Sequence, residues 1–186
     1  QPPFFRADVW LMNPDGSNPT RLTQNPDDDY KPSWSPNSQR IAFNSDRDGD
    51  FEIYTMNFDG SDQTRLTYES ANDRDPTWSP DDTKIAFASN RSGIDHIWTM
   101  NTDGSNPQME TINGAYHDPD WSPIGNILVF TYEVGATNQI YTKNLNTGEI
   151  NQLTYTGLNL QPSWNPDTTL IAFTGGSSIW TMDQRG

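Results

Sequence analysis

Charged and aromatic side chains gather just before each of the first three Trp-Ser-Pro tripeptides of this sequence. Carboxylates with neighbouring aromatics suit a cation, a basic peptide or a polar protein surface. We expect them to lie in loops, where binding residues are usually found. Alternatively, these residues are charged and polar only because they are solvated and form turns. The candidate partner-binding residues are Asp29, Tyr30, Asp73, Arg74, Asp75, Tyr116, His117 and Asp118.

A second acidic set, Asp46, Asp48 and Asp50, alternates around Gly49 and resembles a calcium loop. Such loops combine hard oxygen ligands with a sharp turn at glycine. An EF-hand loop, however, has glycine at its sixth position and glutamate at its twelfth, whereas here the glycine is fourth and the twelfth residue is Asn57. The favoured interpretation is therefore a solvated hairpin turn, with these three aspartates as weaker metal candidates and Ca²⁺ as the candidate ion.

Nucleophilic catalysis has little support in the sequence. There is no cysteine, and the two histidines, His96 and His117, stand at unrelated positions. Neither a Gly-x-Ser-x-Gly nor a His-Glu-x-x-His motif contains them. Acidic residues are abundant, but abundance alone does not indicate paired-carboxylate catalysis. We therefore expect no catalytic residues and predict that the chain is not an enzyme.

The residues around these sets form an internal repeat. Trp34, Trp78, Trp121 and Trp164 follow one another at spacings of 44, 43 and 43 residues. Each begins a Trp-Ser-Pro or Trp-Asn-Pro tripeptide, and nine residues later a phenylalanine closes an apolar run. An Ile-aromatic-Thr segment follows, and most repeats end at Leu-Thr. We attribute the recurring tryptophans to packing between repeats.

Each repeat is predicted to form four short β-strands, because its segments are rich in β-branched and aromatic residues and are bounded by turn residues. A period of 40 to 45 residues with four strands is typical of a β-propeller blade. The predicted fold is thus an all-β propeller of four-stranded antiparallel blades with an N-terminal half blade. It is one propeller or propeller fragment over residues 1–186, with approximate repeat boundaries at 1–23 (half blade), 24–67, 68–111, 112–154 and 155–186.

The number of predicted strands does not determine how the ring of blades closes. Residues 9–23 supply the last two strands of a blade, and the fourth repeat reaches only its third strand. The N-terminal segment could complete the last blade, the chain could be part of a larger ring, or two chains could complete one ring as a homo-oligomer. The connections from each outermost strand to the next innermost strand are expected to converge at one mouth of the central channel.

The composition of the chain argues against two classes of partner, nucleic acid and the membrane interior. The net charge of −14 argues against nucleic acid, whose phosphates require clustered lysine and arginine. No apolar run approaches the roughly 18 residues of a membrane span, so no membrane insertion is expected. An aromatic content of 12% indicates a folded chain despite the low hydrophobicity.

The repeat resembles the TolB-type, WD-repeat-like propeller family. The second copy carries the resemblance best, with Asp73, Pro76, the Trp78-Ser79-Pro80 tripeptide, Ile85-Ala86-Phe87 and Ile97-Trp98-Thr99-Met100-Asn101. The third and fourth copies depart from it, with Tyr116 and Asn159 in place of the aspartate. The resemblance implies a periplasmic or secreted scaffold that binds a protein partner through one channel mouth, with Ca²⁺ as an accompanying ion. The alternative it suggests is a propeller associated with an enzyme, a serine peptidase or a polysaccharide lyase.

Overall fold

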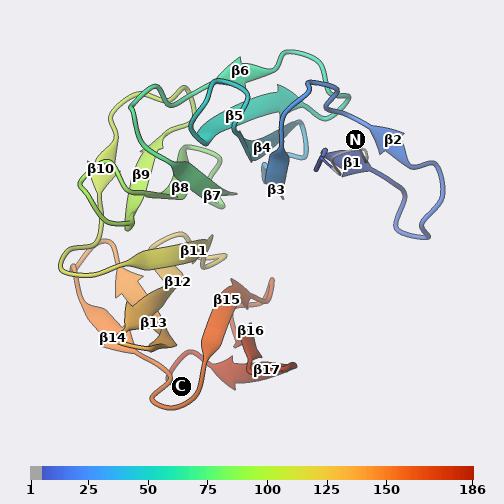
Figure 1. Cartoon of the computed structure of the whole chain (residues 1–186). Coiled ribbons are helices and arrows are strands. Elements are labelled where there is room, and N and C mark those ends of the chain that lie inside the picture. The colour runs from blue at the N-terminus through green and yellow to red at the C-terminus, as the bar shows by residue number, and fades with distance from the viewer. Residues whose placement is uncertain (1–5) are drawn as a thin grey trace.

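Residues 6–186 form an arc of small antiparallel sheets in the computed structural model, and these residues are the ones that the structure describes (Figure 1). Residues 1–5 of the predicted half blade lie outside this range. The described residues form three four-stranded sheets, one three-stranded sheet and one two-stranded sheet. The all-β propeller fold is therefore confirmed. No helix of residues 6–186 is long and apolar enough to cross a membrane.

The strand bounds follow the repeat. The half blade contains β1 (Trp10–Leu11) and β2 (Thr20–Arg21). The first blade contains β3 (Asp29–Trp34), β4 (Arg40–Ser45), β5 (Glu52–Asn57) and β6 (Thr64–Arg65). The second contains β7 (Asp73–Trp78), β8 (Lys84–Ser89), β9 (His96–Asn101) and β10 (Gln108–Met109). The third contains β11 (Tyr116–Trp121), β12 (Ile127–Val134), β13 (Thr137–Asn144) and β14 (Ile150–Gln152). The fourth contains β15 (Asn159–Trp164), β16 (Leu170–Gly175) and β17 (Ser178–Asp183).

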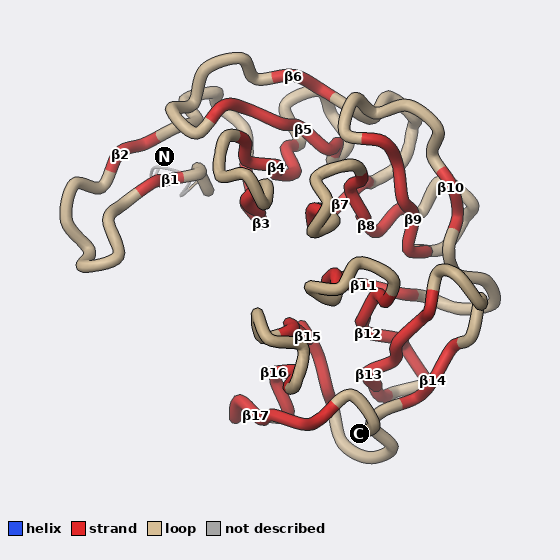
Figure 2. Tube along the Cα trace, turned by 180° about the vertical axis from the view of Figure 1, so that it is seen from behind, coloured by secondary structure: helices blue, strands red, loops and turns tan. Residues whose placement is uncertain are grey.

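The first strand of each blade lies on the inside of the arc, and the fourth lies on the outside (Figures 1 and 2). Neighbouring inner strands contact one another along the arc, β3 with β7, β7 with β11 and β11 with β15. We call these four strands the inner wall. The half blade and β17 stand at opposite ends of the arc, and in the described part of the chain β2 pairs with β1 rather than with β17. The N-terminal segment thus does not complete the last blade in this structure.

The repeating tryptophan packs between blades, as predicted. Trp78 belongs to one core cluster with Ala42 and Ile53 of the preceding blade, and Trp121 belongs to one with Ala86 and Ile97. Trp34 is the exception, with 47% of its surface exposed. The half blade before it lacks the inner strands that would cover the indole ring. Packing on a complete preceding blade therefore decides whether this position is buried.

A threonine, preceded by leucine except at Glu110-Thr111 of the second blade, follows the short outer strand of the half blade and of the first three blades. The threonine Oγ1 accepts a hydrogen bond from a backbone N–H of the third strand in the half blade and in the first three blades. The pairs are Val9 N to Thr23 at 3.0 Å, Ile53 N to Thr67 at 2.9 Å, Ile97 N to Thr111 at 2.9 Å and Ile140 N to Thr154 at 2.8 Å. A side chain thus satisfies an N–H group that the short strand leaves unpaired.

The Asp-Gly turns between the third and fourth strands bring consecutive blades close together. Gly104 has a φ of +85°, and a Cβ atom on it would lie 2.6 Å from the Leu66 carbonyl oxygen of the preceding blade. Gly60 repeats this geometry, with 2.9 Å to the Leu22 carbonyl oxygen. Glycine is required here both by the left-handed backbone and by the neighbouring main chain.

Replacing Gly104 by alanine is expected to lower the free energy of unfolding by about 2 kcal/mol or more, because left-handed strain adds to a backbone clash. Gly49→Ala is the matched control, since its φ is +108° and no atom lies within 4 Å of the added Cβ. Urea unfolding of both variants separates strain from the clash. Equal losses would show that close approach of the blades contributes nothing.

Candidate binding site on the inner wall

Each strand of the inner wall carries a β-bulge at the same repeat position. The strand register shifts there in all four blades. The bulged residues have left-handed backbones, with φ of 53° at Lys31, 55° at Asp75, 49° at Asp118 and 52° at Gln161. A proline follows each of them and cannot donate to the ladder. One side chain per blade is thereby turned away from regular pairing.

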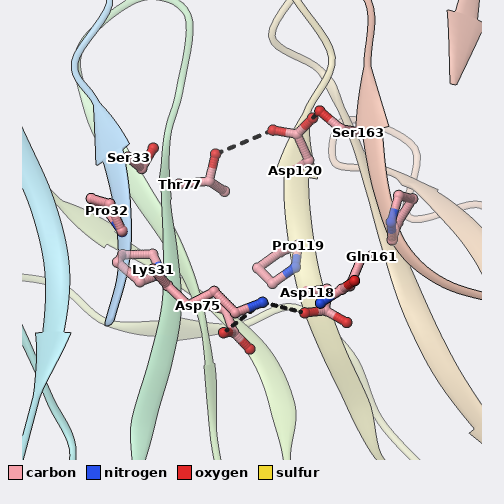
Figure 3. Close-up of a pocket in the computed structure, with 12 residues that line it drawn as sticks. Lys31, Pro32, Ser33, Asp75, Thr77, Asp118, Pro119, Asp120, Gln161 and Ser163 are labelled. Carbon is pink, nitrogen blue, oxygen red and sulfur yellow. Dashed lines mark hydrogen bonds and ion pairs between the residues drawn. The ribbon is translucent and has the colours of Figure 1, made fainter. Parts of the chain in front are cut away.

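These bulges line a cavity of about 220 Å³ on the inner wall (Figure 3). Lys31 of the first blade extends across it toward the second and third blades. Its Nζ lies 3.2 Å from Asp118 Oδ1 and 3.7 Å from Asp75 Oδ1. One ammonium group therefore bridges two carboxylates that come from different sheets.

Burial and charge act together on these groups. Burial raises the pKa of Asp75, and the neighbouring charge of Asp118 raises it further, while Lys31 opposes the shift. Burial on its own lowers the pKa of Lys31, but Asp75 and Asp118 outweigh it, so the pKa is raised. Lys31 thus remains a cation at neutral pH, held by two carboxylates.

Asp120 joins three strands of the inner wall. Its Oδ2 accepts hydrogen bonds from Trp164 N at 2.8 Å and from the Ser163 hydroxyl at 3.1 Å. Its Oδ1 accepts one from the Thr77 hydroxyl at 3.3 Å (Figure 3). Asp120 is not among the residues predicted from the sequence to bind a partner. A departure from the repeat could have identified it. The other repeats carry Ser33, Thr77 and Ser163 at this position, and only the third carries an acid.

Burial raises the pKa of Asp120, because its hydrogen bonds do not fully replace hydration. A carboxyl with a raised pKa contributes most stability below its unfolded value of about 3.9 and loses that contribution as the pH rises through its folded value. We therefore expect the stability of the wild type relative to Asp120→Asn to fall from pH 4 to pH 8. Urea unfolding of both proteins across this range tests it, and a relative stability that rises with pH would contradict it.

Three of the predicted binding residues lie in the blade interior rather than on exposed loops. Asp29 and Asp73 begin β3 and β7 and are 2% and 0% exposed. A guanidinium from the hairpin between the second and third strands covers each, with Arg47 Nη2 3.0 Å from Asp29 and Arg91 Nη2 2.6 Å from Asp73. Tyr116 takes the equivalent place in the third blade, where its ring stacks on Tyr132 at 4.5 Å. These side chains serve the fold, because they offer almost no surface to a partner.

The other predicted residues are closer to solvent. Asp75 and Asp118 line the cavity described above. Tyr30, Arg74 and His117 share one repeat position next to the bulges; Tyr30 is 42% exposed, Arg74 stacks on Phe51, and His117 Nδ1 lies 3.8 Å from Asp95. The structure thus brings five of the eight predicted residues to one end of the inner wall.

The acidic loop of the first blade does not form a cation cage. Asp46 Oδ1 accepts a hydrogen bond from Asp28 N at 2.8 Å, whereas Asp48 contacts the Tyr54 hydroxyl and lies 3.1 Å from Arg65 Nη1. Asp50 is exposed. Within residues 6–186 no three acidic, histidine or cysteine side chains lie close enough to hold a metal ion. The calcium-loop interpretation therefore has no support, because these carboxylates are directed to separate turn and ion-pair partners.

The sequence matches the pattern of the TolB beta propeller domain over residues 6–71 and 47–184. Together these matches span nearly all of the chain, and the chain belongs to this family. No curated protein sequence matches it.

Solved structures of similar fold agree with this family. TolB from Acinetobacter baumannii superposes with a TM-score of 0.81 at 22% identity, covering 95% of this chain and 46% of that one. A putative TolB from Agrobacterium tumefaciens has a TM-score of 0.79 and 26% identity, covering 89% and 64%. An oligogalacturonate lyase from Vibrio parahaemolyticus has a TM-score of 0.68 at 15% identity, covering 96% and 57%. The chain thus spans about half to two thirds of the length of these structures.

Proposed function

We propose that this chain is a non-enzymatic protein-binding propeller that holds a polar partner against its inner wall. The observation that carries the proposal is the bridge of Lys31 between Asp75 and Asp118, which collects three charged side chains from three blades in one cavity. Charged groups on a rigid scaffold suit the recognition of a partner with complementary charge, because they need no rearrangement on binding.

The net charge of −14 favours a partner with a basic contact surface. A basic side chain of the partner could share the carboxylates that now hold Lys31. Membership of the TolB propeller family supports a periplasmic or secreted location and an envelope protein as the partner. Propeller folds also occur in enzymes such as the oligogalacturonate lyase, so the non-enzymatic role rests on the site and not on the fold.

The test is capture of a partner from an envelope extract, identification by mass spectrometry and titration of the purified partner against variants. We expect Asp75→Asn/Asp118→Asn to weaken binding by about tenfold or more, because charge-assisted contacts to both carboxylates are lost. The control is Asp62→Asn/Glu149→Gln, which makes the same charge change at exposed turns of the outer strands. Equal losses in both variants would contradict the site, and failure of the wild type to bind any protein specifically would contradict the function.

A further inference from the structure

A second cavity, of about 320 Å³, lies between the first two blades. Tyr30, Lys31, Asn44, Phe51, Arg74 and Asp75 line it. Lys31 and Asp75 also line the inner-wall cavity, so the two cavities adjoin. We call this second cavity the interblade pocket.

Two aromatic rings form the apolar side of the interblade pocket. The centroids of Tyr30 and Phe51 lie 6.0 Å apart, with the ring planes inclined at 52°. Tyr30 is 42% exposed, so part of its ring is accessible to a ligand. Concave sites lined by aromatics with a few polar groups are typical of ligand recognition.

Arg74 supplies the charge of the interblade pocket. Its guanidinium carbon lies 4.9 Å from the centre of the Phe51 ring. It forms no ion pair with any residue of the described range 6–186. A ring face holds the guanidinium in place but leaves its N–H groups free for a carboxylate.

The next gap along the arc provides an internal comparison. There Asp95 stands at the repeat position of Phe51, and His117 stands at the position of Arg74. His117 Nδ1 lies 3.8 Å from Asp95 Oδ2, so the second gap holds a carboxylate of its own beside the basic group. In the first gap a phenyl ring replaces that carboxylate. The carboxylate that does line this pocket, Asp75, pairs with Lys31 and not with Arg74. Arg74 is therefore available to an anion that a ligand supplies.

We propose that the interblade pocket binds the C-terminal residue of a polypeptide when that residue is apolar. Its side chain lies between Tyr30 and Phe51, and its terminal carboxylate pairs with Arg74. The net charge of −14 disfavours a polyacidic segment, whereas a chain terminus brings only one carboxylate. This inference rests on the proposed protein-binding function, because it names the part of the partner that the adjoining pocket takes.

The probes are N-acetyl-Ala-Phe with a free carboxylate and the same dipeptide as its C-terminal amide. Each is titrated against the full chain by ligand-observed NMR or calorimetry. We expect the free acid to bind and the amide to bind at least about tenfold more weakly, since the amide cannot form a charge-assisted pair. Arg74→Gln should remove this preference for the acid.

Phe51→Asp is the sharper variant, because it restores inside the chain the carboxylate found in the second gap. It should abolish binding of the free acid while Arg74 is still present. Arg185→Gln, an exposed arginine after β17, should leave both probes unaffected. Thermal unfolding checks that each variant is folded. If Phe51→Asp does not fold, the comparison of acid and amide in Arg74→Gln alone tests the proposal.

Binding of the free acid that depends on Arg74 supports the proposal. Equal binding of acid and amide, binding unchanged by Arg74→Gln, or no binding to the wild type would overturn it. Asp118 lines the inner-wall cavity but not the interblade pocket, so partner binding by Asp118→Asn reports on the proposed function alone. The two probes and Arg74→Gln report on the interblade pocket, so the two failures are distinguishable.

Discussion

Replacing Arg91 by methionine is expected to lower the free energy of unfolding by about 3–5 kcal/mol, because it leaves the Asp73 carboxylate buried without its charge partner. The two side chains are 2.6 Å apart, and that of Asp73 is fully buried. The guanidinium also stacks on Phe87 and Trp98, at 5.3 and 4.9 Å from their ring centres. Urea unfolding followed by tryptophan fluorescence measures the loss.

The pH dependence of that loss gives a further check. Burial already raises the pKa of Asp73, and removal of Arg91 should raise it more. The loss in Arg91→Met should therefore shrink as the pH falls and the buried carboxyl of the folded state becomes neutral. The double variant Asp73→Asn/Arg91→Met should recover part of the stability. Arg185→Met, which breaks an exposed pair, should leave stability almost unchanged. A loss independent of pH would show that ring stacking, rather than charge, gives Arg91 its importance.

Replacing Phe87 by alanine is expected to cost about 3–5 kcal/mol, because the ring is fully buried where the first and second blades meet. Phe173 occupies the same repeat position in the fourth blade, but it is only partly buried. Phe173→Ala should therefore cost clearly less for the same chemical change. Urea unfolding of both variants makes the comparison. Equal costs would mean that the difference in burial between the two rings does not set the cost of removing them.

The repeat made the strands and their order predictable, because tryptophan, phenylalanine and Leu-Thr recur in one register and each has a single packing role. The role of the acids was harder to predict. Asp73 and Asp75 are two residues apart, yet one is covered by Arg91 and the other lines the inner-wall cavity. Regular alternation along a strand would place both on the same face.

The bulge after Arg74 separates Asp73 from Asp75, and no pattern of residue types in the repeat showed it beforehand. Asp120 was missed for a related reason. Its neighbours Thr77 and Ser163 come from other blades, 43 residues away on either side. Contacts of that range depend on the curvature of the whole arc, which a strand pattern does not specify.

The bulges of the inner wall also bear on how such a protein can change over evolutionary time. Each blade offers one side chain to the common cavity from a backbone position outside its regular ladder. The present occupants are a lysine, two aspartates and a glutamine. A new combination of side chains at these four places would alter what the cavity recognises while the phenylalanines and tryptophans that hold the blades stay as they are. Under the proposed function, specificity and stability are encoded at separate positions of the repeat, and a lineage can explore new partners without first rebuilding its scaffold.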